Sequence, residues 1–215
     1  MKVIEAIRRE LEPLNREVEK ALKPSREALL RFVQNQLYIV PHDLKALSVA
    51  MAKAREPDEY RFVKLLVDGD YAALDTLWGL AGELGVSFNW DAVDPAAVAY
   101  THFLSWLAIH GTAGDLAVAM TVNLPVWGRN CVALAEWARR NGVRNTKFMD
   151  LFAGPYDELE ALAEPIAERY LDWGRYRFVA RAIQHYELEF WRAVSGAGPP
   201  GIQPPRTLSS LKTRS

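Results

Sequence analysis

The chain has a single cysteine, Cys131, among its 215 residues, so it cannot form an internal disulfide. It contains neither CxxC nor HExxH spacing, and its four histidines are scattered. We therefore expect no metal ion and no other cofactor. The 26 basic and 27 acidic residues leave a net charge of −1, which gives no field to concentrate nucleic acid or an anionic membrane. Neither is an expected partner.

Long hydrophobic runs are also missing from the chain. There is no stretch of about 18 uncharged apolar residues, and the N-terminus contains no signal-like apolar segment. We expect a protein that is neither exported nor membrane-spanning. Together with the lack of a cysteine pair, this favours a cytoplasmic location.

Alternating β-branched runs are scarce, whereas apolar residues recur three and four apart along most of the chain. This spacing predicts an all-α bundle of about eight helices, formed as one domain by residues 1–197. Residues 198–215 contain four prolines, basic residues and no acid. That composition predicts a flexible basic tail.

Local sequence signals predict where several helices begin and end. Ser25 is a predicted N-cap, and Asp94 followed by Pro95 predicts the start of another helix. Pro41 is expected to end or kink a helix because it removes a backbone donor. The pair Gly69-Asp70 is expected to break the next helix.

A long helix that begins near Ala113 contains Pro125, which predicts a kink and leaves the carbonyl of Thr121 without its helical partner. Asn123 and Trp127 lie beside this kink. A free backbone acceptor and a buried amide suit a heteroaromatic ligand, but a structural kink filled by water explains them equally well.

Glu187 is the most informative single residue, because it lies in an apolar stripe on the last predicted helix. The stripe consists of Val179, Ile183, Phe190 and Val194. A carboxylate that faces a core needs a cation, a hydrogen-bond network or a raised pKa. Glu187 is therefore either half of a buried salt bridge or an acid/base group. Tyr100 is a second candidate, because it can offer a ligand a buried hydroxyl, although ordinary core packing also explains it.

Three segments, taken in order and spacing, resemble the TenA family. Gln34-Asn35-Gln36-Leu37-Tyr38 is similar to its Gln-Asp-x-x-Tyr, and Ala99-Tyr100-Thr101 with Gly111 is similar to its Ala-Tyr-Thr and following glycine. Glu187-Leu188-Glu189-Phe190-Trp191 is similar to its terminal Glu-x-x-Phe-Trp. The resemblance covers residues 25–195 and implies a haem-oxygenase-like helical bundle.

The best-known members of this family are thiaminase II enzymes, which hydrolyse the aminopyrimidine of thiamin or of its breakdown products. The resemblance implies that Glu187 is the catalytic acid/base. It places the family's pyrimidine-binding aspartate on Asn35. Its catalytic cysteine falls on Asn123 by spacing, or on Val126 if Pro125 is aligned, so this chain lacks the nucleophile. The implied substrate-binding residues are Asn35, Tyr38, Tyr100, Asn123, Trp127 and Phe152.

Three functions remain open at this point. The chain is a hydrolase that uses water activated by a carboxylate, or a binding or regulatory protein that retains the pocket without turnover. The third function is a cofactorless oxidase, because Asn35-x-x-Tyr38-x-x-Pro41 is similar to a stretch of PqqC. A di-iron site is not expected, since the last helix has a single histidine, His185. The expected partners are an aminopyrimidine and copies of the chain itself, since tetramers are usual among relatives.

Overall fold

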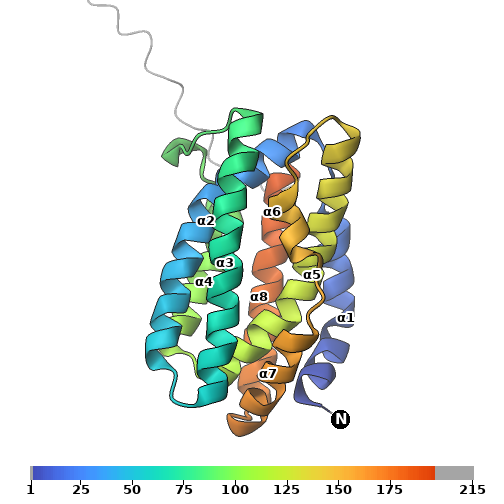
Figure 1. Ribbon diagram of the computed structural model, residues 1–215. Coiled ribbons are helices and arrows are strands. Elements are labelled where there is room, and N and C mark those ends of the chain that lie inside the picture. The colour runs from blue at the N-terminus through green and yellow to red at the C-terminus, as the bar shows by residue number, and fades with distance from the viewer. Residues whose placement is uncertain (1, 197–215) are drawn as a thin grey trace, which may run out of the picture.

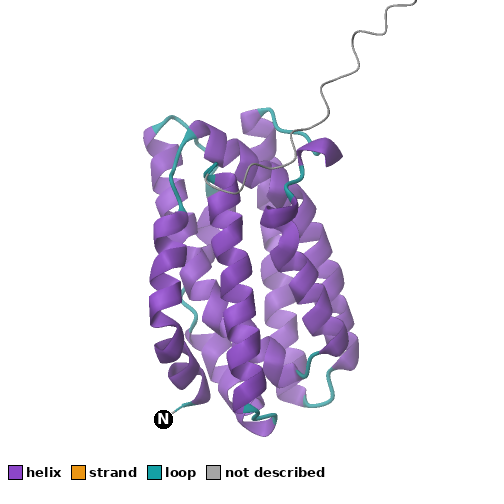
Figure 2. Ribbon diagram, turned by 180° about the vertical axis from the view of Figure 1, so that it is seen from behind, coloured by secondary structure: helices purple, strands orange, loops and turns teal. Residues whose placement is uncertain are grey.

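The computed structural model describes residues 2–196, which form a bundle of eight α-helices joined by short loops (Figure 1). The predicted all-α fold is confirmed, because this part of the chain contains helices and no strand (Figure 2). The predicted tail at 198–215 lies outside the described residues. The elements are α1 (Val3–Ala21), α2 (Arg26–Lys53), α3 (Pro57–Leu84), the 3-10 helix η1 (Trp90–Ala92), α4 (Pro95–His110), α5 (Ala113–Arg140), α6 (Lys147–Asp150), the 3-10 helix η2 (Leu151–Ala153), α7 (Asp157–Arg169) and α8 (Trp173–Val194).

The last helix, α8, lies in the middle of the bundle and packs against α1, α4 and α5 (Figure 1). Helix α2 packs against α3 and α4. The apolar core consists of two clusters, and the side chain of Tyr100 contacts both of them. Within residues 2–196, no helix combines the length and the apolar character needed to cross a membrane.

Two predicted helix starts are confirmed, and each has a local chemical cause. The hydroxyl of Ser25 accepts a hydrogen bond from the Ala28 amide at 3.0 Å, which caps α2. The carboxylate of Asp94 accepts one from the Ala96 amide at 2.9 Å, and Pro95 is the first residue of α4. These caps depend on residues within one turn, so sequence alone reveals them.

The predicted break at Gly69-Asp70 is wrong, and Pro41 does not end its helix. Helix α2 continues through Pro41, and α3 continues through Gly69 and Asp70. An internal proline costs about 3 kcal/mol and a glycine about 1 kcal/mol, which are amounts that packing of the flanking residues can outweigh. Both helices bury apolar residues on either side of the predicted break. The continuity matters for function, because it places residues 43 and 70 on rigid helices.

The Thr121 carbonyl is not a free acceptor for a ligand, so the first of the two alternatives for this carbonyl is wrong. Pro125 lies inside the continuous helix α5, and the Thr121 carbonyl accepts hydrogen bonds from Nε and Nη2 of Arg8, with Nε at 3.2 Å. Arg8 also pairs with Glu160 of α7 at 2.5 Å. The group that proline leaves unsatisfied is therefore bound by α1, which ties three helices together.

Arg8→Met is expected to lower the free energy of unfolding by about 1.5–3 kcal/mol, the usual contribution of hydrogen bonds to a charged group. Arg9→Met is the matched control, because Arg9 is exposed and pairs with Glu5 one turn away. An exposed pair of this kind contributes about 0.5 kcal/mol or less. Urea unfolding of both variants checks the prediction, and equal losses would contradict this role of Arg8.

Candidate functional site

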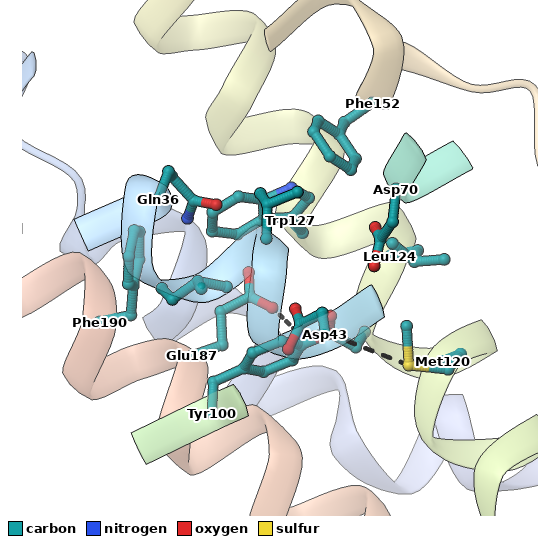
Figure 3. A pocket seen from close by; sticks show the side chains of 13 residues that line it. Gln36, Asp43, Asp70, Tyr100, Met120, Leu124, Trp127, Phe152, Glu187 and Phe190 are labelled. Carbon is teal, nitrogen blue, oxygen red and sulfur yellow. Dashed lines mark hydrogen bonds between the residues drawn. The ribbon is translucent and has the colours of Figure 1, made fainter. Parts of the chain in front are cut away.

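A cavity that is partly open to solvent lies between α2, α3, α4, α5 and α8 (Figure 3). Its wall is mainly apolar and aromatic, and it contains three carboxyl groups but no lysine, arginine or histidine. The lining residues are Gln36, Ile39, Val40, Asp43, Asp70, Tyr100, Met120, Asn123, Leu124, Trp127, Phe152, Glu187 and Phe190.

Glu187 lies on the cavity wall and is 2% exposed. Its two carboxyl oxygens accept hydrogen bonds from the side-chain amide of Asn123 and, at 3.1 Å, from the indole of Trp191. Burial raises the pKa of Glu187 to about 8, although both hydrogen bonds act to lower it. Among the described residues, no lysine or arginine forms a salt bridge with it. This favours the acid/base alternative over the buried salt bridge.

A chain of hydrogen-bonded side-chain amides fixes the position of Asn123, which donates to Glu187. The Nδ2 atom of Asn123 also donates to Oε1 of Gln184, one turn before Glu187, at 3.1 Å. Nε2 of Gln184 in turn donates to Oδ1 of Asn15 on α1. Because both hydrogens of Asn123 are used in this way, its Oδ1 is left as an acceptor at the cavity wall.

Aromatic side chains form much of the rest of the wall. Trp127 meets Phe190 and Phe152 edge to face, with ring centroids 5.1 Å and 5.8 Å apart. The segment that carries Phe152 packs closely on α5 at Gly128, where a Cβ atom would collide with the Phe152 carbonyl oxygen. The Tyr156 hydroxyl donates to that same carbonyl at 2.5 Å. These contacts hold Phe152 over the cavity.

Asp43 and Asp70 are functional candidates that sequence reasoning missed. Asp43 is 6% exposed, and one of its oxygens accepts a hydrogen bond from the Thr101 hydroxyl. Burial, followed by the neighbouring Asp70 carboxyl, raises the pKa of Asp43 well above its usual range. Burial raises the pKa of Asp70 to about 7. Both groups therefore hold protons more tightly than ordinary aspartates.

Gln36 is the third missed residue. It is 3% exposed and lines the cavity, yet no residue described by the structure forms a hydrogen bond with its amide. Figure 3 shows this amide beside Trp127. A buried amide usually has a partner, so Gln36 offers a donor and an acceptor to whatever occupies the cavity.

The sequence-predicted site residues divide into two groups. Tyr100, Asn123, Trp127, Phe152 and Glu187 come together around the cavity. Asn35 and Tyr38 do not line it. The Asn35 amide donates to the Arg31 carbonyl at 2.8 Å and accepts from the Asp94 amide at 2.9 Å, so it joins α2 to the start of α4. Tyr38 stacks on His42 at 4.1 Å, and its hydroxyl bonds His102.

Helical geometry explains why these two residues lie outside the cavity. Residues three, four and seven apart share one face of a helix, so Gln36, Ile39 and Asp43 point into the cavity together. Asn35 and Tyr38 lie on a different face of α2. Neither Val126 nor Cys131 lines the cavity, and burial raises the pKa of the Cys131 thiol well above its usual range. No thiol therefore faces a ligand there.

Several solved structures share this fold. A TenA homologue from Pyrococcus furiosus is 21% identical over 88% of this chain and 98% of its own, with a TM-score of 0.65. A TenA family transcription regulator from a Silicibacter species is 19% identical, with 89% and 95% covered and a TM-score of 0.66. A TenA homologue from P. horikoshii is 15% identical, with 92% and 100% covered and a TM-score of 0.71. These likenesses show the fold.

The sequence itself gives the family. No curated protein matches it, but residues 19–197 match the TENA/THI-4/PQQC family. This match includes all of the residues that line the cavity. The chain therefore belongs to the TENA/THI-4/PQQC family.

Proposed function

We propose that the protein binds an aminopyrimidine compound in this cavity and hydrolyses it with Glu187 as the acid/base group. The observation that carries the proposal is a buried carboxyl with a raised pKa, held in place by Asn123 and Trp191, on the wall of an aromatic cavity. Catalytic acids are commonly tuned by burial in this way.

The cavity wall supports binding of a flat, nitrogen-rich ring. Trp127, Phe152 and Phe190 provide aromatic surface, against which a heteroaromatic ring can stack. The carbonyl oxygen of Asn123 accepts a hydrogen bond from a ring amino group, and the amide of Gln36 both donates and accepts.

The protonated state of Glu187 sets the order of the chemical steps. For aminomethyl-pyrimidine, the carboxyl carries a proton at neutral pH and donates it to the neutral form of the amine nitrogen, and the carbon–nitrogen bond breaks. The carboxylate then accepts a proton from water, whose oxygen forms the new bond to that carbon. The products are a hydroxymethyl-pyrimidine and a free amine, and Glu187 regains its proton.

Binding without turnover is the second candidate. It is favoured by the absence of a thiol from the cavity wall, since the resemblance gives the nucleophile's position to Asn123 by spacing, or to Val126 if Pro125 is aligned. One of the proteins of the same fold is described as a transcription regulator. In this alternative, the aromatic walls and the amides serve recognition alone.

A turnover assay with aminomethyl-pyrimidine and with thiamin separates the two candidates. Hydrolysis is expected to release hydroxymethyl-pyrimidine that carries ¹⁸O when the reaction is run in ¹⁸O-labelled water, because water supplies the new oxygen. A rise in thermal midpoint without product would favour a binding protein. If neither compound binds or reacts, the aminopyrimidine assignment is wrong.

A homo-oligomer in the cytoplasm remains a prediction. Size-exclusion chromatography with light scattering measures the oligomeric state directly, and the tetramers usual among relatives set the expected mass. The absence of a bound cofactor likewise remains a prediction.

A further inference from the structure

The cavity contains an unbalanced set of acidic groups. Asp43, Asp70 and Glu187 come from three different helices, and no positively charged side chain lines the same space. Asp43 and Glu187 are buried and Asp70 is half-buried, and removing carboxylates from water without a cation is costly. The pKa of each of the three groups is raised accordingly. A positively charged ligand would supply the missing countercharge.

The two aspartates are available to such a ligand. One oxygen of Asp43 accepts from Thr101, and its other oxygen has no partner among the described residues. Asp70 has no hydrogen-bond partner among residues 2–196, and it stands where the main cavity meets an adjoining one. Tyr100 and Glu187 are the other titratable groups that line the main cavity, and Tyr156 and Glu158 line the adjoining one. None of these four groups is a cation.

The unpartnered amide of Gln36 is an independent sign of a ligand. Gln36 and Asp43 are seven residues apart on one face of α2, which corresponds to about 10 Å along the helix axis. In Figure 3, Gln36 and Asp70 lie on opposite sides of the view, with Glu187 between them. The cavity thus has a neutral polar end and an acidic end, separated by aromatic surface.

We propose that the cavity recognises an organic cation, whose protonated amino group binds between Asp43 and Asp70 while an uncharged edge of its ring pairs with the Gln36 amide. An ammonium group fits better than a metal ion, because no three potential ligands among residues 2–196 are grouped so as to hold a metal. The inference deepens the proposed function and relies on it for the identity of the ring.

Two pairs of probes that differ in charge test the inference by titration calorimetry. The first pair is benzylamine and benzyl alcohol, which present an ammonium or a hydroxyl on the same aromatic ring. The second pair is aminomethyl-pyrimidine and hydroxymethyl-pyrimidine, titrated into Glu187→Gln protein so that hydrolysis does not consume the amine. The ammonium member of each pair is expected to bind at least about tenfold more tightly near pH 7, consistent with a charge-assisted hydrogen bond.

Asp70→Asn is the informative variant, because it removes one charge and breaks no hydrogen bond among the described residues. It is expected to reduce the preference for the ammonium probe to roughly threefold or less. Asp75→Asn, a change at an exposed position on the same helix, is the matched control and should leave the preference unchanged. Cation binding to the wild type should also release protons, since burial raises the pKa of Asp70 to about 7. Buffers with different ionisation enthalpies detect that release.

The possible results separate this inference from the proposed function. A preference for benzylamine that depends on Asp70, without binding of either pyrimidine, supports the cation site and contradicts the aminopyrimidine assignment. Equal binding of both pyrimidines, or a preference that survives Asp70→Asn, overturns the cation site and leaves the assignment standing. Absence of binding by every probe overturns both.

Discussion

Glu187→Gln is expected to lower the turnover of aminomethyl-pyrimidine by roughly 10²–10⁴-fold, the usual contribution of a positioned proton-transfer group. Glutamine has nearly the same shape as glutamic acid and retains an oxygen that can accept a hydrogen bond from Asn123 or Trp191. It cannot donate a proton to the leaving nitrogen or accept one from water. The loss should therefore appear in kcat, with the protein still folded and still able to bind the product.

Two control variants make this result specific. Glu189→Gln changes a carboxylate on the same helix that pairs with Arg192 away from the cavity, and it should leave turnover unchanged. Cys131→Ala should also leave turnover unchanged, because the buried thiol does not line the cavity. A large fall in the melting temperature of Glu187→Gln, with unchanged turnover per folded molecule, would assign Glu187 to structure.

The parts of the fold that were predictable from sequence depend on neighbouring residues. The N-caps at Ser25 and Asp94 each bond an amide within one turn, and the apolar stripe around Glu187 repeats along a single helix. The continuous course of α2 through Pro41 depends on helices packed against it. The bond from Arg8 to Thr121 joins residues 113 apart in sequence, so no local pattern could reveal it.

The candidate site also contains some residues that the sequence indicates and others that it does not. The sequence indicates Glu187 as a site residue because a carboxylate on an apolar stripe must be paired, hydrogen-bonded or protonated. The resemblance implies Tyr100, Trp127 and Phe152. The sequence-based site did not include Gln36 and Asp43. They are seven residues apart with Ile39 between them, a spacing that places all three residues on one face of a helix. The resemblance places the pyrimidine-binding position on Asn35, which instead links two helices.

The sequence does not indicate Asp70 as a site residue, for a different reason. The pair Gly69-Asp70 predicts a break in a helix, and residues at a break usually face solvent. Because α3 continues through this pair, Asp70 is held on a helix wall and reaches the cavity. Which face of α3 meets α2 is a property of the assembled bundle, which the sequence pattern does not specify.

The thermal midpoint of the wild type is expected to fall as pH rises from about 5.5 to about 8.5, and Glu187→Gln should fall less. The pKa of Glu187 is raised from an ordinary value of 4.5 to about 8 by burial. A carboxyl with a raised pKa in the folded state stabilises that state most below its unfolded pKa. This stabilisation is lost progressively as pH rises through the folded pKa, because the buried group must then ionise.

The size of the difference follows from the two pKa values. Between about pH 5.5 and 8.5, ionisation of Glu187 should cost the wild type about 3 kcal/mol more than the variant. For a domain of this size, that corresponds to roughly 6–12 °C in thermal midpoint. Asp43 and Asp70 shift the midpoints of both proteins in the same direction, so the difference between the two curves isolates Glu187. Parallel curves for wild type and variant would mean that Glu187 is already ionised at neutral pH, and the cavity would then lack the proton donor on which the proposed hydrolysis depends.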